Sequence, residues 1–318
     1  MRRRTLLSFG IAELIALPGI THAQLPGRTY RLARLTSSAP SDAVVQELAR
    51  AGFLVGKNLV LDEAVTTPQE LPARAVEIVA GNPDVIYAGG DSAARAALAA
   101  TRTIPIVTIS DNLQSSGLLT SLARPEGNLT GVNIFANELN GKRQELLSEL
   151  MPGLKRLAIL ADPATAGPEL VETLVKAANA RAISSTVYRV TGPDGIPAAI
   201  QAARADGAQA MNVFASPLFH SRHVEILAQL AEARLVAIFQ WPEYVQEGAV
   251  IAYGPRLDSI YRTLIAQQLI KILKGAKPAD VPAEQPTDFK LGINLKTAKA
   301  LGLTIPPSIL ARADEVIE

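Results

Sequence analysis

The sequence predicts an α/β protein with two doubly wound parallel-sheet lobes, and three observations support this prediction. Short apolar runs alternate with alanine- and leucine-rich helical patterns along most of the 318-residue chain. The apolar runs are nearly continuous, as in strands that are buried on both faces of a parallel sheet. The alternation is interrupted at LARPEGNLTGVNI, which is rich in Pro, Gly and Asn, and then resumes. Two such series in succession predict two lobes.

The first series is expected to form strands at YRLARLT, NLVLDEAV, DVIYAG and IPIVTIS. The helix SDAVVQELARAG begins at a cap made by Ser41 and Asp42 and ends at Gly52. The next helix, QELPARAVEIVAGN, ends at Gly81. A third helix is expected over 92–100, and a short helix over 113–122 follows the fourth strand.

The second series repeats the pattern. Helices are expected over 139–150, 168–180, 196–205, 220–233 and 242–246. They alternate with strands at RLAILAD, STVYRV, AQAMNVFAS, LVAIFQ and AVIAYG. A long helix over 257–273 ends at Lys274 and Gly275, and the Pro-rich segment KPADVPAEQPTDF looks like another crossing between lobes. The last residues supply a final strand and two short helices.

Composition excludes several classes of function. Hydrophobic residues make up 48% and charged residues 19%, which suits a packed core and not a disordered chain. The net charge is +1, so the charge balance gives no reason to expect a nucleic-acid partner. The chain has no cysteine, which excludes disulfides, thiolate catalysis and Cys-ligated zinc.

The first residues predict export. MRRRTLLSFGIAELIALPGITHAQ has a basic start, an apolar run and a small-x-small site that ends at Ala23. This order is typical of a signal peptide, so we expect residues 1–23 to be removed by cleavage after Ala23 and the mature protein to be periplasmic. The apolar run is interrupted by Pro18 and Gly19 and is short for a span of about 20 residues, which argues against a membrane anchor. The arginines also fit a twin-arginine signal weakly.

Polar residues follow most of the predicted strands. In open α/β sheets, ligands bind beyond the carboxyl ends of strands and beside the N-termini of helices. Small polar side chains at these positions are typical of a cleft that hydrogen-bonds a small molecule. The candidate ligand-binding residues are Ser37, Ser38, Asp91, Ser92, Ala93, Asp111, Asn112, Asn133, Asp162, Ser216, Trp241, Glu243 and Tyr253.

Ser92 invites an enzymatic interpretation that the rest of the chain does not support. A nucleophile elbow requires G-x-S-x-G, whereas the residue two positions after Ser92 is Ala94. The histidines are His22, in the predicted signal peptide, and His220 and His223, and neither of the last two has an Asp three residues before it, as a GDS-type esterase would. A serine without a base is a poor nucleophile. We therefore expect Ser92 to cap a helix and contact a ligand, with no catalytic residue in the chain.

No cofactor or metal is expected. His220 and His223, with Glu225, lack a third ligand at a recognised spacing, so a solvated helix start is the simpler interpretation. The dinucleotide fingerprint G-x-G-x-x-G and the P-loop are both absent.

Aromatic residues gather in the second series although they make up only 4% of the chain. Phe214 and Phe239 end strands and are expected in the core. Trp241 and Tyr253 lie just beyond predicted strand ends, where each ring either stacks on a ligand or packs between elements of the lobe. The sequence leaves these two alternatives open.

Several long motifs resemble one protein family in order. They are ELARAGFLVGKNLVLDEAV, TRTIPIV, LLTSLARPEGNLTGV, LNGKRQELLSELMPGLKRLAILADP, SPLFHSRHVEILAQLAEARLVAIF, EGAVIAYGP and the C-terminal ILKGAKPADVPAEQPTDFKLGINLKTAKALGLTIPPSILARADEVIE. Over essentially the whole mature chain, these segments resemble ABC-transporter substrate-binding proteins of the tryptophan/tyrosine type.

The resemblance implies a type I periplasmic-binding-protein fold, in which a three-stranded hinge joins two lobes that close on a ligand. With the crossings expected from the sequence, lobe 1 comprises 28–130 plus 254–284 and lobe 2 comprises 131–253 plus 285–318. The resemblance also implies a cognate ABC permease and ATPase as partners, and we expect the protein itself to be a monomer.

The chain departs from the family in its ligand loops. The family's turn G-T-P-A-A is Gly90–Ala94 here, with Asp91 and Ser92 in place of Thr and Pro. V-G-D-P has become SDNLQ, and Y-G-F-R-E-F has become FQWPEY over 239–244. The Asn that follows Y-G-P is Arg256. The expected ligand is therefore an amino acid or a related compound, aromatic ones included, and the resemblance does not decide which.

The charges of the candidate residues restrict the class of ligand further. A ligand carboxylate is expected to meet N–H groups around Ser92 and Ala93, near Ser37 or Ser38. A ligand ammonium group would pair with Asp91, Asp111 or Glu243. An unpaired carboxylate in a closed cleft is costly, so these acids favour a cationic or zwitterionic ligand over an anion.

Three alternatives remain beside a transporter's binding protein. A ligand sensor that signals to a membrane receptor would have the same features. An exported serine hydrolase would use Ser92. A repressor core shares the fold, but the predicted export signal and the lack of a helix-turn-helix before the first strand argue against DNA binding.

Overall fold

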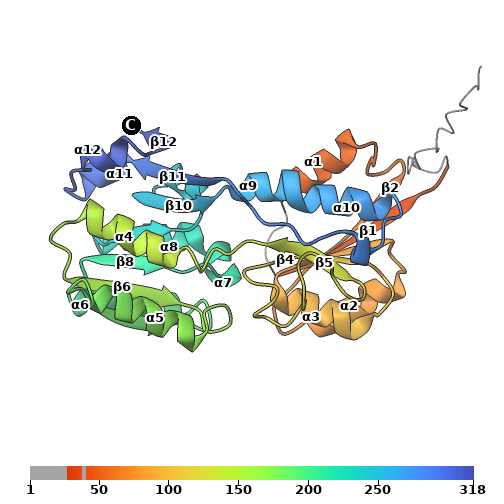
Figure 1. Ribbon diagram of the computed structural model, residues 1–318, viewed down its shortest axis with the longest axis horizontal. Coiled ribbons are helices and arrows are strands. Elements are labelled where there is room, and N and C mark those ends of the chain that lie inside the picture. Colours follow the sequence, from red (N-terminus) through yellow and green to blue (C-terminus); the bar gives the residue numbers. More distant parts are fainter. Residues whose placement is uncertain (1–26, 38–40) are drawn as a thin grey trace, which may run out of the picture.

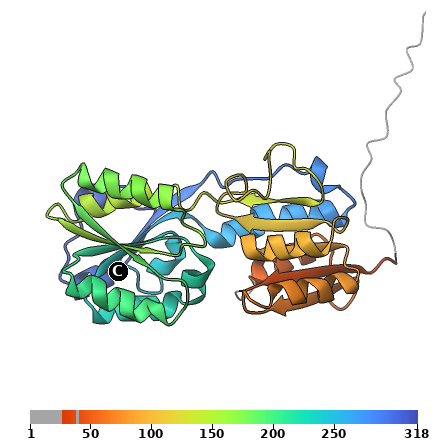
Figure 2. The same ribbon diagram turned by 90° about the horizontal axis from the view of Figure 1, so that it is seen from below.

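The computed structural model describes residues 27–37 and 41–318. The predicted signal peptide, its cleavage site at Ala23 and the candidate residue Ser38 lie outside these ranges. Two α/β lobes stand side by side, each built around its own sheet (Figures 1 and 2). The predicted division into two lobes with predominantly parallel sheets is confirmed.

The first sheet has the strand order β2-β1-β3-β4-β5, and every pair in it is parallel. Its strands are β1 (Tyr30–Thr36), β2 (Leu59–Val65), β3 (Val85–Gly89), β4 (Ile106–Ser110) and β5 (Leu129–Asn133). Helices α2 (Leu71–Ala80) and α3 (Asp91–Ala100) cover one face, and α1 (Asp42–Arg50) and α10 (Ala266–Leu273) cover the other. The inner strands β3 and β4 are buried on both faces of the sheet, which explains their continuous apolar runs, whereas the edge strand β2 is partly exposed and carries Asp62 and Glu63.

The second sheet has the order β12-β11-β10-β9-β8-β6-β7. Its strands are β6 (Arg156–Ala161), β7 (Ser184–Arg189), β8 (Ala210–Val213), β9 (Val236–Phe239), β10 (Ile251–Pro255), β11 (Phe289–Asn294) and β12 (Glu315–Ile317). Helices α4 (Asn140–Leu150), α5 (Pro168–Asn179), α11 (Leu295–Ala300) and α12 (Pro307–Leu310) pack on one face. Helices α6 (Gly195–Ala205) and α8 (His223–Glu232) pack on the other.

One strand pair departs from the parallel pattern. β11 runs antiparallel to β10, and Tyr253 is paired with Leu291. The chain leaves the second lobe at the end of β10 and returns to it through β11, so the returning strand starts where the departing strand ends. Beyond it lies β12, which the sequence did not predict.

The chain passes between the lobes three times: after β5, after β10 and before β11. The third crossing segment is held against β5, because Glu284 N donates to Gly131 O and Asn133 N donates to Glu284 O, at 3.0 and 2.9 Å. The lobe boundaries predicted after residues 130 and 253 fall inside β5 and β10. The second crossing enters a long helix made of α9 (Leu257–Ser259), a π-helical turn η2 (Ile260–Ile265) and α10.

Two predicted helices differ in the structure. The segment 113–122 has no helix, because the Asn112 side chain accepts hydrogen bonds from Gln114 N and Ser115 N and Gly117 has a φ of +70°. Both features favour turns over a helix. The helix predicted over 220–233 is two helices, α7 (Pro217–Ser221) and α8, which meet at Arg222.

Candidate ligand-binding site

The two lobes approach each other at the N-termini of α3 and α7. A Cβ built on Gly90, the residue before α3, would lie 3.8 Å from Cγ of Pro217, the first residue of α7. Figure 1 shows α7 on the side of the second lobe that faces the first. Asp91 and Ser216, each adjacent in sequence to one of these residues, are therefore brought to the same region between the lobes.

The three candidates at the start of α3 have different environments. Asp91 is the first residue of the helix and is half-buried, and this burial raises the pKa of its carboxyl group. Ser92 is exposed, and Ala93 is fully buried. The capping role expected of Ser92 is wrong, because Gly90 is the N-cap and no side chain makes a cap hydrogen bond there. A carboxylate at the first turn interacts favourably with the helix dipole. The Asp91 side chain therefore occupies the position at which the carboxylate of a ligand was expected.

Asp111 and Asn112 follow β4 and contact the first crossing. Asp111 Oδ1 accepts a hydrogen bond from Asn137 N at 2.9 Å, and Asn112 Nδ2 donates to Glu138 Oε1 at 2.8 Å. Burial, together with the negative charge of Glu138, raises the pKa of Asp111 to about 7. Both candidates thus fasten the loop after β4 to the segment that leaves the first lobe.

Asn133 lies in the interior at the end of β5. Its side chain is fully buried, and Oδ1 accepts from Leu113 N at 2.6 Å. It positions the loop that carries Asp111 and Asn112. Its Nδ2 has no hydrogen-bond partner within the described part of the chain.

Asp162 and Ser216 are brought together from the ends of β6 and β8. Ser216 Oγ donates to Asp162 Oδ2 at 2.6 Å and accepts from Leu218 N at 3.0 Å, so it caps α7. Asp162 Oδ1 accepts from Ala164 N at 2.9 Å. Both side chains are buried, which makes this pair a rigid support for the α7 N-terminus.

Glu243 lies in the short 3₁₀ helix η1 (Pro242–Val245), beside the second crossing. Its Oε1 accepts from Asp258 N at 3.3 Å, at the N-terminus of the long helix of the first lobe, and its Oε2 is buried without a partner among the described residues. Burial raises the pKa of Glu243. This carboxylate therefore joins the two lobes.

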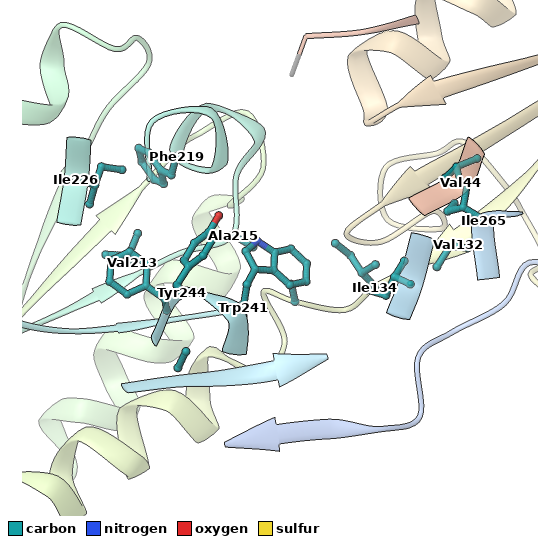
Figure 3. Packing of buried hydrophobic residues seen from close by; sticks show 14 of the residues in the cluster. Val44, Val132, Ile134, Val213, Ala215, Phe219, Ile226, Trp241, Tyr244 and Ile265 are labelled. Atoms are coloured by element: carbon teal, nitrogen blue, oxygen red, sulfur yellow. The ribbon is translucent and has the colours of Figure 1, made fainter. Parts of the chain in front are cut away.

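The two aromatic candidates are placed differently. Trp241 is buried, and its ring points toward Ile134 of the first crossing (Figure 3). Tyr253 lies within β10 and not beyond its end, and it packs against a core on the α4 face with its ring 6.5 Å from that of Phe289. Ser37, at the end of β1, is half-buried. Phe214 and Phe239 are fully buried, which confirms the prediction that they belong to the core.

The two histidines hold segments of the second lobe together. His220 Nδ1 lies 2.6 Å from Tyr244 Oη, and His223 Nε2 lies 2.6 Å from a carboxylate oxygen of Glu247. The rings of His223 and Tyr244 stack at 4.6 Å. Burial lowers the pKa of His220 to about 4, so this ring is neutral at neutral pH.

A set of buried polar residues in and beside α4 was not predicted from the sequence. Arg143 is fully buried, and Asn137, Asn140 and Asn212 are buried beside it. A signal was present in the helix NGKRQELLSEL, because Arg143 shares a face with Leu147 and Leu150 at spacings of four and seven residues. A charge on the apolar face of a helix indicates a specific buried role.

In the described ranges, no helix is long and apolar enough to span a membrane.

Comparison with known proteins identifies related chains. The sequence model of the family described as ABC transporter substrate binding protein matches residues 38–317. A tyrosine-binding protein from Clostridioides difficile is 24% identical over 266 residues, covering 81% of this chain and 75% of the relative.

Solved structures agree in fold. A conserved domain protein from Vibrio cholerae has a TM-score of 0.82 at 24% identity, with 91% of this chain and 100% of that chain covered. An ABC domain from Streptococcus pneumonia, in complex with L-Trp, has a TM-score of 0.80 at 20% identity, with the same coverage of 91% and 100%.

Proposed function

This chain belongs to the ABC transporter substrate-binding protein family, and from that premise we propose that it captures an amino acid or a closely related compound between its lobes and delivers it to a permease. Proteins of this family bind ligands and are not enzymes. The fold supports the proposal, because two lobes joined by three crossings can rotate about the hinge and enclose a small molecule. A ligand that contacts both lobes favours the closed arrangement.

The observation that carries the proposal is the meeting of α3 and α7. The approach of Gly90 to Pro217 brings Asp91, from the first lobe, into the region of the Asp162–Ser216 pair of the second. A ligand held there touches both lobes at once. Such double contact is the condition for coupling binding to closure.

The ligand class follows from charge. Asp91 is half-buried and has a raised pKa, so a neighbouring cation stabilises its ionised form. Arg95, one turn further along α3, already lowers this pKa without cancelling the effect of burial, and a ligand ammonium group would supply a second cation. The family relatives whose names mention tyrosine and L-Trp support an amino acid at this site.

A thermal-shift screen with amino acids, aromatic acids and their amides tests the proposal on the mature protein. A true ligand at 100 times its dissociation constant adds about 2.7 kcal/mol to the free energy of unfolding. Isothermal calorimetry then gives the affinity of each hit. The proposal fails if no amino acid or related compound stabilises the protein.

The substitution Asp91→Ala tests the role of the carboxylate. We expect it to abolish the ligand-dependent shift while the unliganded protein stays folded. Asp194→Ala is the matched control, because Asp194 is an exposed acid at the start of α6 whose side chain makes no cap hydrogen bond. Unchanged ligand binding by Asp91→Ala would remove Asp91 from the site.

We further propose that the protein acts in the periplasm with a cognate permease and ATPase, as a monomer without a nucleic-acid partner. N-terminal sequencing of the protein from the periplasmic fraction is expected to begin at Gln24. A chain that retains Met1 in that fraction would contradict cleavage after Ala23.

A further inference from the structure

We propose that Asn137 and Arg143 are positioning residues of the solute-binding cycle, which hold the first crossing against the second and so set the angle between the lobes. This inference rests on the proposed function, because it concerns the hinge that would close on a solute. Arg143 lies in the first turn of α4 and Asn137 in the loop before it, outside the meeting point of α3 and α7.

A continuous chain of hydrogen bonds connects the lobes. Asn137 N donates to Asp111 Oδ1 at 2.9 Å, and Asn140 Nδ2 donates to Asn137 Oδ1 at 3.1 Å. Arg143 Nη1 donates to Asn140 Oδ1 at 2.7 Å, and Arg143 Nε donates to Tyr253 O at 2.9 Å. We call these five residues the hinge relay. It runs from the loop after β4, through the first crossing and α4, to β10, from which the second crossing leaves.

Asn137 also binds the loops of the second lobe. Its Nδ2 donates to Thr165 O and Ala215 O, at 3.3 and 3.2 Å, and its Oδ1 accepts from Ala215 N at 3.1 Å. Ala215 precedes the Ser216 cap of α7. The Asn137 side chain therefore holds the first crossing against the loop of the second lobe that contains Ala215 and leads to α7.

Arg143 is the unusual member of the hinge relay. Its guanidinium is fully buried, and none of the described carboxylates lies within ion-pair distance of it. Its Nη2 has no partner in the described structure, and burial lowers its pKa to about 9. A buried cation is costly to keep when no carboxylate contacts it, and the charge of Asp111 offsets this cost only at longer range. An arginine here therefore indicates a demand for its geometry. Its two bonds join a helix side chain to the backbone of the strand that leads to the second crossing.

The ionisation of Asp111 should make the angle between the lobes depend on pH. If the hinge relay only stabilised the fold, no such pH dependence would be expected. Asp111 faces Asn137 and Glu138 of the first crossing and Arg143 of α4, and its burial, together with the charge of Glu138, raises its pKa to about 7. We expect opening of the lobes to move the first crossing away from the loop after β4, which would expose Asp111 to water and return its pKa toward 3.8. The closed arrangement therefore binds the proton more tightly, and closure is favoured as the pH falls below about 7.

The absence of cysteine allows a direct measurement of the lobe angle. Val76 on α2 and Val224 on α8 are exposed side chains, one on each lobe. The double variant Val76→Cys, Val224→Cys carries one spin label on each lobe. Pulsed electron paramagnetic resonance then measures the distance between the two labels in the absence of ligand. Arg143→Met in this background is expected to broaden the distance distribution and shift it to longer distances.

Gln144→Met is the matched control. Gln144 is buried on the same helix, but neither polar atom of its side chain has a partner in the described structure. It is expected to leave the distribution unchanged. Asn137→Asp keeps the backbone N and the Oδ1 acceptor of the hinge relay but places a carboxylate oxygen against Thr165 O and Ala215 O. It is expected to loosen the first crossing from the second lobe and to shift the distribution to longer distances. A distribution in Arg143→Met identical to that of the parent would overturn the proposal.

The pH readout uses the same labels. We expect the parent to shift toward shorter distances between about pH 8.5 and pH 5.5, and Asp111→Asn to remove this dependence. Glu138→Gln removes a charge next to Asp111 and is expected to move the transition to lower pH. Glu172 is an exposed acid, so Glu172→Gln is the control and is expected to leave the transition unchanged. These measurements need no ligand, so failure of the solute-binding proposal would appear in the thermal-shift screen and not here.

Discussion

At the residue scale, two glycines allow the crossing strands to pack. A Cβ on Gly131 of β5 would lie 2.2 Å from Thr108 O, and a Cβ on Gly254 of β10 would lie 2.1 Å from Gln240 O. In each lobe, the strand that leads to a crossing thus lies so close to a neighbouring backbone carbonyl that there is no space for a side chain at the glycine. The backbone itself would have to move to accommodate one.

We therefore expect Gly131→Ala to lower the free energy of unfolding by about 1–3 kcal/mol, the usual cost of overpacking. Urea denaturation measures the change as a lower midpoint at an unchanged slope. Gly153→Ala is the control, because a Cβ there meets nothing within 4 Å. Equal stability of the two variants would show that β5 shifts without cost.

At the scale of elements, a single side chain ties the long C-terminal helix to the hinge. Gln268 of α10 is fully buried, and its Nε2 donates to Gly131 O at 2.9 Å and to Pro282 O at 3.3 Å. These oxygens belong to β5 and to the segment that leads to the third crossing. The helix is docked by its apolar face and oriented by this amide.

Replacing Gln268 by Leu keeps the size of the side chain but removes both bonds. Gly131 O keeps its hydrogen bond from Glu284 N. The free energy of unfolding is therefore expected to fall by only about 1 kcal/mol, at the lower end of the range for a buried hydrogen bond. Thermal unfolding measures it. The neighbouring Gln267 is exposed, and Gln267→Leu should stay within about 0.5 kcal/mol of the parent. A loss of the same size in both variants would contradict the docking role.

At the scale of the molecule, one apolar core extends through both lobes. This interlobe core contains Leu32 and Val132 of the first lobe, Ile134 of the first crossing, and Phe219 and Trp241 of the second lobe (Figure 3). Residues that share a core lose their packing together. The two lobes should therefore unfold in one cooperative transition, although each has its own sheet.

Differential scanning calorimetry tests this directly. We expect one transition for the parent and, for Ile134→Ala, a transition that broadens or separates into two as the packing between the lobes is lost. Ile309→Ala is the matched control, since Ile309 is fully buried in a core confined to the second lobe. Each truncation costs about 2–5 kcal/mol, but only the first should change the number of transitions. Two separate transitions in the parent would show that the shared core does not couple the lobes.

The order and type of most elements, the two lobes and much of the core can be predicted from the residues alone. Helix α1 begins at its predicted Ser41 cap, and α2 ends at its predicted Gly81. These features depend on local periodicity and on backbone preferences within a few residues, so the pattern of residues carries them directly.

The contacts between polar groups of different elements could not be predicted in this way. The predicted positions of Asp91 and Ser216 at strand ends did not show that Gly90 would approach Pro217, and nothing local placed Tyr253 O beside Arg143. These contacts join residues more than 100 positions apart and depend on the path of the three crossings. The position of Arg143 on the apolar face of its helix could have indicated burial, but nothing in the sequence showed that it would contact Tyr253 O or that Asn137 would contact Asp111 and Ala215.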